Sequence, residues 1–211
     1  MIDQGRLAEL LAISPVIPVL TIEDVAHAVP LARALLEGGI GVVEVTLRTR
    51  AGLPAMAAMV AEVPGMVVGA GTVLTAAQYR AVDEIGAQFV VSPGSSPLVL
   101  EAAARSKVPF LPGAATPTEV LHLLEGGYLL QKFFPAEPAG GIPMLKAIGA
   151  PITDVRFCPT GGITLGNARD YLALANVVCV GGSWLTPADA MRDGDWRRIT
   201  ALAAEAAALK R

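Results

Sequence analysis

Short apolar runs of strand length alternate along the chain with longer segments of helical periodicity. Each run is rich in Val, Ile, Leu or Phe and is followed by a Gly, Pro or Thr turn and then an Ala/Leu-rich segment. The runs recur every roughly 20 to 26 residues, the spacing of a βα unit with parallel strands. We expect strands at residues 16–20, 42–46, 67–69, 89–92, 109–111, 129–134, 155–159 and 177–180.

The intervening segments predict helices and, with the strands, a fold class. Because the strands are short and hardly alternate, both of their faces should be covered, as in parallel sheets. Roughly eight βα units in one domain fit a (β/α)8 TIM barrel, whereas a doubly wound open sheet would normally use fewer units in this length. An extra N-terminal amphipathic helix at 3–13 should close the floor of the barrel. The other helices are expected at 25–37, 54–63, 76–85, 97–106, 117–125, 142–148, 165–173 and 196–210.

The composition and charge of the chain limit the classes of protein to which it can belong. The chain has 211 residues, 53% of them hydrophobic, and no linker-like shift in composition, so we expect one domain over residues 1–211. The longest uncharged stretch, 171–188, is broken by Gly and Pro and therefore predicts no membrane span. A net charge of −3 and scattered arginines argue against nucleic-acid binding. No secretory signal is visible and the two cysteines lie in apolar runs, which favours the cytoplasm.

Lys132 and Glu44 are charged residues inside apolar strand-like runs. Burial among Leu and Phe disfavours an ammonium and leaves an amine that can form a Schiff base. The alternative is a strand-end lysine that extends its ammonium to water. Glu44 needs a partner if it is buried. It is either a general acid and base or half of a structural ion pair with Arg48 or Lys132.

The barrel rule places an active site at the C-terminal ends of the strands. Arg48 could present a fork of donors to a carboxylate there. Gly-Gly turns after the last two strands would let backbone amides approach a phosphate. The two histidines lie away from strand ends, so we expect neither a metal nor a cofactor. The candidate site residues are Lys132, Glu44, Arg48, Thr72, Pro93, Phe134, Thr160, Gly161, Gly162, Gly182 and Ser183.

Five segments carry a family resemblance: 44–49 (EVTLRT), 69–72 (GAGT), 92–94 (SPG), 132–137 (KFFPAE) and 156–163 (RFCPTGGI). In this order they resemble the 2-dehydro-3-deoxy-phosphogluconate (KDPG) aldolase family, many of whose members also cleave 4-hydroxy-2-oxoglutarate (KHG). The resemblance implies a class I aldolase that splits 2-dehydro-3-deoxy-6-phospho-D-gluconate into pyruvate and D-glyceraldehyde 3-phosphate. It also implies a cytoplasmic homotrimer.

The resemblance also implies a role for each candidate. Lys132 would form the Schiff base, Glu44 would transfer protons, and Arg48 with Thr72 would bind the pyruvate carboxylate. Two alternatives stay open: a sibling aldolase for the phosphogalactonate epimer, and a phosphosugar-binding barrel without catalysis. Gln131 departs from the family, which usually has an aliphatic residue before the lysine. Thr160 and Phe134 would line the pocket, and the phosphate would rest on Gly161, Gly162, Gly182 and Ser183.

Overall fold

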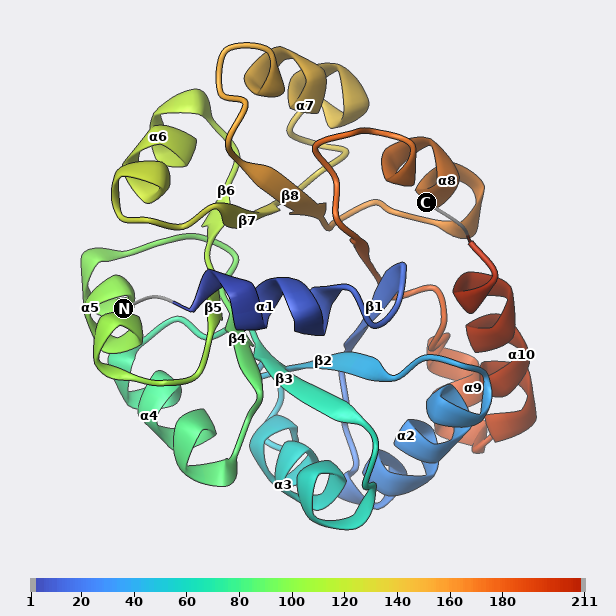
Figure 1. Ribbon diagram of the computed structural model, residues 1–211. Coiled ribbons are helices and arrows are strands. Elements are labelled where there is room, and N and C mark those ends of the chain that lie inside the picture. Colours follow the sequence, from blue (N-terminus) through green and yellow to red (C-terminus); the bar gives the residue numbers. More distant parts are fainter. Residues whose placement is uncertain (1–2, 210–211) are drawn as a thin grey trace.

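The computed structural model describes residues 3–209 and shows an α/β fold in which helices surround the strands (Figure 1). All strand pairs are parallel and form two sheets, one with the order β5-β4-β3-β2-β1-β9 and one with the order β6-β7-β8. The strands are β1 Val16–Leu20, β2 Val42–Thr46, β3 Val67–Gly71, β4 Phe89–Val91, β5 Phe110–Leu111, β6 Gly113–Ala114, β7 Leu130–Phe133, β8 Arg156–Pro159 and β9 Val180–Gly182.

Helices follow the strands as the periodicity predicts, except that the predicted helix 25–37 begins as a 3-10 turn and that a short helix at Ala188–Asp193 was not predicted. Several helices begin at Ser or Thr caps. Thr75, Ser96 and Thr116 each accept a hydrogen bond from a backbone N–H three residues on, which satisfies a donor that the helix leaves free. None of the helices within residues 3–209 is long and apolar enough to cross a membrane. The helices are α1 Gln4–Leu11, a 3-10 turn η1 Val25–His27, α2 Ala28–Glu37, α3 Gly52–Glu62, α4 Ala76–Ile85, α5 Pro97–Arg105, α6 Pro117–Glu125, α7 Gly141–Gly149, α8 Leu165–Leu172, α9 Ala188–Asp193 and α10 Trp196–Ala207.

The strands differ from the prediction of eight continuous ones in a single barrel. Every predicted run overlaps a strand, but the fifth continues past Pro112, and its two pieces belong to different sheets. Proline has no N–H, so it interrupts the ladder; its carbonyl still accepts a hydrogen bond from the Lys132 N–H at 2.8 Å. Within residues 3–209, two isolated bridges, Phe157–Val177 and Thr160–Gly181, join the β8 region of one sheet to the β9 region of the other.

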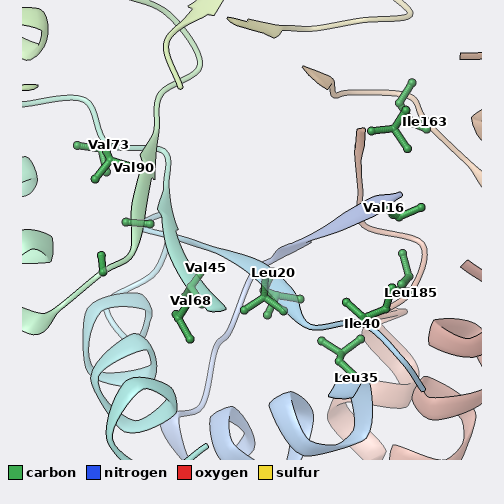
Figure 2. Close-up of a cluster of buried hydrophobic side chains, with 14 of the residues drawn as sticks. Val16, Leu20, Leu35, Ile40, Val45, Val68, Val73, Val90, Ile163 and Leu185 are labelled. Atoms are coloured by element: carbon green, nitrogen blue, oxygen red, sulfur yellow. The ribbon is translucent and has the colours of Figure 1, made fainter. Parts of the chain in front are cut away.

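Apolar side chains fill the space between the strands and the outer helices. Figure 2 shows Leu20, Val45 and Val68, from three neighbouring strands, on the same side as Leu35 of α2 and Ile40. All five are buried. Successive strand residues point to opposite faces, so the alternate residues of the same strands form a second buried cluster. Burial on both faces explains why these strands lack polar alternation.

The helix α1 lies across the second cluster, in the middle of the ring of strands (Figure 1). The Gln4 side chain fixes it to the beginning of β7 by accepting a hydrogen bond from the Leu130 N–H at 2.8 Å. The helix therefore covers the N-terminal ends of the strands and leaves their C-terminal ends open. The buried residues of this cluster are Leu7, Leu10 and Leu11 of α1, the strand residues Ile17, Val42, Phe89, Val91, Leu111, Leu130 and Cys158, and Val178 and Cys179 just before β9.

Gln131 explains how β7 orients its lysine. The Gln131 side chain is fully buried. Its amide donates to the carbonyl of Val120, within α6, at 3.1 Å and to the carbonyl of Tyr128, in the loop after α6, at 3.0 Å. Gln131 therefore faces the outer helices. Because side chains alternate along a strand, Lys132 points the opposite way, into the ring.

Candidate active site

Glu44 and Lys132 meet inside the ring of strands. Lys132 Nζ donates to Glu44 Oε1 across 3.1 Å, although the two residues belong to strands β2 and β7 of different sheets. Glu44 is 4% exposed and Lys132 is 3% exposed. Either charge alone would be strongly destabilising at this depth, whereas the hydrogen-bonded pair offsets much of the cost of desolvation.

Two glycines lie on the strands that neighbour this pair, and Gly71 makes room for the Glu44 carboxylate. A Cβ atom on Gly71 of β3 would stand 2.2 Å from Oε1 of Glu44. Gly113 lies opposite Lys132 in the β6–β7 register, and a Cβ atom there would stand 2.3 Å from the Pro93 carbonyl carbon. The sequence thus has glycine, which lacks a side chain, on the strands beside Glu44 and Lys132.

Gly71→Ala should therefore destabilise the protein, because its methyl group would overlap the Glu44 carboxylate. We expect the free energy of unfolding to fall by about 1–3 kcal/mol, the usual cost of overpacking. Gly94→Ala is the matched control, since a Cβ atom on Gly94 would have no neighbour within 4 Å. Chemical denaturation of both variants measures the difference. Equal stability of the two would show that the glycine at position 71 does not make room for the pair.

A cleft of about 540 Å³ opens at the C-terminal ends of the strands. Phe134 links it to the ion pair, because this residue lines the cleft and its ring centroid lies 5.3 Å from Lys132 Nζ. The cleft brings together seven of the predicted site residues, Arg48, Phe134, Thr160, Gly161, Gly162, Gly182 and Ser183, with Val19, Pro135, Glu137, Pro138, Ile163 and Gly181.

Thr72 and Pro93 are not among the residues that line the cleft, and each adjoins a glycine on a strand that neighbours the ion pair. Thr72 directly follows Gly71, and the Pro93 backbone packs on Gly113. Thr72 has a φ of 58°, the left-handed region that residues other than glycine rarely adopt. Such strain is characteristic of functional sites, where the surrounding structure holds it in place.

Arg48 is exposed and lies in the loop after β2. Its neighbours fix that loop on both sides. The Leu47 N–H donates to the Gly71 carbonyl at 2.9 Å, and the Thr49 hydroxyl donates to the Ile22 carbonyl at 2.5 Å. The guanidinium can therefore reach over the cleft from a defined backbone position.

The Gly161–Gly162 turn after β8 has two consecutive left-handed residues, with φ of 99° and 82°. Only glycine adopts this conformation without strain. The segment after β7 runs alongside, since the Ala136 N–H donates to the Thr160 carbonyl at 2.8 Å and the Glu137 N–H donates to the Gly161 carbonyl at 3.0 Å. The turn is therefore built into the wall of the cleft.

Sequence reasoning missed Glu137 and Tyr171. Glu137 lines the cleft, and its Oε1 accepts a hydrogen bond from the hydroxyl of Tyr171, a fully buried residue of α8. Glu137 lies inside the segment 132–137 that resembles the aldolase family, which was a usable signal. Tyr171 gives no such signal, because a tyrosine on the apolar face of a helix reads as core.

Within residues 3–209, no group of three or more His, Cys, Asp and Glu side chains could hold a metal ion. The polar groups gathered at the cleft are instead an amine, a carboxylate, a guanidinium, hydroxyls and glycine turns. These can bind anions and transfer protons, and the amine can act as a nucleophile.

A buried Lys–Glu pair beside a cleft at the strand ends of an α/β fold is an arrangement that a Schiff-base aldolase can use. Its sequence matches the model of the KDPG and KHG aldolase family over residues 7–202, and the chain belongs to this family.

Three relatives illustrate the similarity. The KHG/KDPG aldolase of Escherichia coli (strain K12) is 51% identical over 197 residues, which cover 93% of this chain and 92% of that protein. A KDPG aldolase from Legionella pneumophila, solved with pyruvate captured at low pH as a covalent carbinolamine, is 46% identical with a TM-score of 0.93 and covers 95% and 98% of the two chains. The KDPG aldolase of Zymomonas mobilis ZM4, solved with 3-phosphoglycerate, is also 46% identical with a TM-score of 0.93. The match covers 100% of this chain and 98% of that chain.

Proposed function

We propose that the protein is a class I aldolase that cleaves 2-dehydro-3-deoxy-6-phospho-D-gluconate to pyruvate and D-glyceraldehyde 3-phosphate. By the same chemistry it would cleave 4-hydroxy-2-oxoglutarate to pyruvate and glyoxylate. The observation that carries the proposal is the buried contact between Lys132 Nζ and Glu44 Oε1, 3.1 Å long, beside an open cleft. The covalent carbinolamine of pyruvate in the Legionella relative supports it.

Cleavage of the C3–C4 bond of the substrate needs a group that can accept the electron pair of that bond, and a protonated imine at C2 is such a group. Lys132 adds to the C2 carbonyl of the substrate, and loss of water from the carbinolamine gives a protonated imine. The C3–C4 bond then breaks as the C4 hydroxyl loses its proton, which releases the aldehyde and leaves an enamine. Protonation of the enamine at C3 and hydrolysis of the imine release pyruvate and regenerate the amine.

Glu44 would serve these steps as a single acid and base. Its carboxylate is in direct contact with the amine that reacts, so it can carry protons during formation of the carbinolamine. It would also remove the C4 hydroxyl proton and return a proton to the enamine carbon. Glu44 becomes neutral when it accepts a proton and negatively charged when it donates one, so a single residue can act as base in one step and as acid in the next.

The remaining site residues would bind the two ends of the substrate. Arg48 and Thr72 would hold the pyruvate carboxylate near the ion pair, where charge-assisted hydrogen bonds are strong. The Zymomonas relative with bound 3-phosphoglycerate supports a phosphate subsite in this family. In our assignment Phe134 and Thr160 line the pocket between the two ends, and Gly161, Gly162, Gly182 and Ser183 receive the phosphate. Pro93 would contact the substrate from outside the cleft lining.

The proposal extends to the architecture and setting of the enzyme. We take β5 and β6 as one strand interrupted at Pro112, and the bridges between β8 and β9 as the closing contact of an eight-stranded barrel with α1 on its floor. A single domain, a homotrimeric assembly and a cytoplasmic location belong to the same proposal.

A direct assay tests the function. The purified protein should release pyruvate from 2-dehydro-3-deoxy-6-phospho-D-gluconate faster than from its phosphogalactonate epimer, as measured by coupling to lactate dehydrogenase. Preference for the epimer would instead identify the sibling aldolase. Absence of pyruvate from either substrate and from 4-hydroxy-2-oxoglutarate would leave a binding barrel without catalysis.

Ser183→Ala tests the phosphate subsite. Ser183 is exposed on the cleft, so its hydroxyl should donate to the phosphate and contribute about 1–3 kcal/mol to kcat/KM for the phosphorylated substrate. Cleavage of unphosphorylated 4-hydroxy-2-oxoglutarate should hardly change and serves as the internal control. Equal losses for both substrates would mean that this turn shapes the barrel and does not bind phosphate.

A further inference from the structure

A buried phenol holds an exposed carboxylate at the wall of the cleft. The Tyr171 hydroxyl donates to Glu137 Oε1, although Tyr171 is fully buried in the core and Glu137 is exposed. Burial, followed by the hydrogen bond to Glu137, raises the pKa of Tyr171 well above its ordinary value. The phenol therefore stays protonated and continues to donate throughout the neutral and mildly alkaline pH range.

The held side chain packs directly on the Gly161–Gly162 turn. A Cβ atom on Gly162 would lie 2.6 Å from both Cβ and Cγ of Glu137. The Glu137 N–H donates to the Gly161 carbonyl at 3.0 Å, and the Asn167 amide donates to the Gly162 carbonyl at 3.2 Å. Glu137 and Asn167 thus each hold one carbonyl of the turn.

Glycine also makes room at the other end of the pair. A Cβ atom on Gly141, at the start of α7, would lie 3.0 Å from the Tyr171 hydroxyl and 3.2 Å from Glu137 Oε1. Gly141 has a φ of 58°, so a side chain there would be strained as well as crowded. The Tyr171–Glu137 contact is therefore enclosed between two glycine positions.

A carboxylate beside a phosphate would repel it, so Glu137 is poorly suited to bind that group directly. Its packing on Gly162 gives it a different task. We propose that Tyr171, acting through Glu137, is a positioning residue that fixes the Gly161–Gly162 turn for the phosphate of the substrate. The inference deepens the proposed function and rests on it, because it assigns the preference for phosphorylated substrates to a contact outside the phosphate subsite.

Tyr171→Phe removes the hydroxyl and leaves the ring in the core. We expect KM for 2-dehydro-3-deoxy-6-phospho-D-gluconate to rise about tenfold, the scale of one hydrogen bond to a charged group, with kcat nearly unchanged. Kinetics with 4-hydroxy-2-oxoglutarate should stay within about twofold of the wild type, since that substrate has no phosphate to place. A folded variant with this split cannot be explained by general loss of structure.

Tyr79→Phe is the matched control. Tyr79 of α4 is also buried, at 1% exposed, and its hydroxyl donates to the Val108 carbonyl at 2.8 Å, outside the residues that line the cleft. This variant should show no difference between the two substrates. The same tenfold rise in Tyr79→Phe, equal losses on both substrates in Tyr171→Phe, or no loss at all would each overturn the inference.

Binding of inorganic phosphate separates this inference from the proposed function. Titration of phosphate into the wild type and the Tyr171→Phe variant, followed by NMR, should show about tenfold weaker binding in the variant. Weaker phosphate binding in the variant, together with a wild type that does not cleave the phosphorylated substrate, would support the positioning role and refute the proposed function. Unchanged phosphate binding in an active aldolase would refute the positioning role alone.

Discussion

Lys132→Arg should lose turnover by about 10⁴-fold or more, the scale seen when an enzyme loses its nucleophile. Arginine keeps a positive charge that can pair with Glu44, so the buried carboxylate is not left uncompensated. Its guanidinium does not form the imine. Lys146→Arg makes the same exchange at an exposed position of α7 and should leave turnover unchanged. The measurement is pyruvate release from the phosphorylated substrate.

Borohydride trapping locates the covalent step. Treatment with pyruvate and borohydride should add one reduced adduct to Lys132 of the wild type, as identified by peptide mass spectrometry, and none to the corresponding peptide of the Lys132→Arg variant. Lys107 and Lys146 are exposed, whereas Lys132 is paired with the buried carboxylate of Glu44. An adduct on either of them, or turnover that survives in Lys132→Arg, would refute the Schiff-base mechanism at Lys132.

The sequence predicted the site residues that lie at or near the C-terminal ends of the predicted strands. Parallel strands joined by helices bring their C-terminal ends to one side, so residues 88 positions apart in the sequence, Glu44 and Lys132, become candidates for one site. The sequence could not choose between Lys132 and Arg48 as the partner of Glu44. That choice depends on which side chains reach the middle of the ring, and the structure gives it to Lys132.

Interruptions of the strands were harder to foresee. The sequence predicted a strand that ends at Leu111. In the structure a second short strand, β6, follows on the other side of Pro112. The missing N–H of Pro112 interrupts the ladder, so that β5 pairs with β4 and β6 pairs with β7. Likewise the regular strand β9 begins at Val180, because Val177 meets β8 only through an isolated bridge to Phe157.

The roles of Gly71 and Tyr171 could not be predicted, because they depend on residues that are neighbours only in space. A glycine such as Gly71 reads as part of a turn until its distance to the Glu44 carboxylate is known. Tyr171 lies 34 residues from Glu137 on the buried face of a helix, where a hydroxyl partner is invisible to periodicity. Such contacts depend on how helices pack against strand ends, and periodicity gives only which face is buried.

Glu44→Gln should separate imine formation from proton transfer. Glutamine has nearly the shape of glutamate, and its amide oxygen can still accept the hydrogen bond from Lys132 Nζ. It cannot shuttle a proton, so exchange of the pyruvate methyl protons with deuterated water should slow by about 10²-fold or more. Proton NMR of pyruvate in the presence of each protein measures the exchange.

The trapping reaction supplies the second half of this test. Borohydride should still fix pyruvate to Lys132 in Glu44→Gln, at a reduced rate, because the amine and the cleft are intact. Glu101→Gln is the control, since Glu101 is exposed and pairs only with Arg105 on the surface of α5. Near-normal methyl exchange in Glu44→Gln would assign the base to another group, and the buried ion pair would then serve only to keep Lys132 in place. Slow exchange with trapping preserved would show that Glu44 transfers the methyl protons of pyruvate, while the imine itself still forms on Lys132.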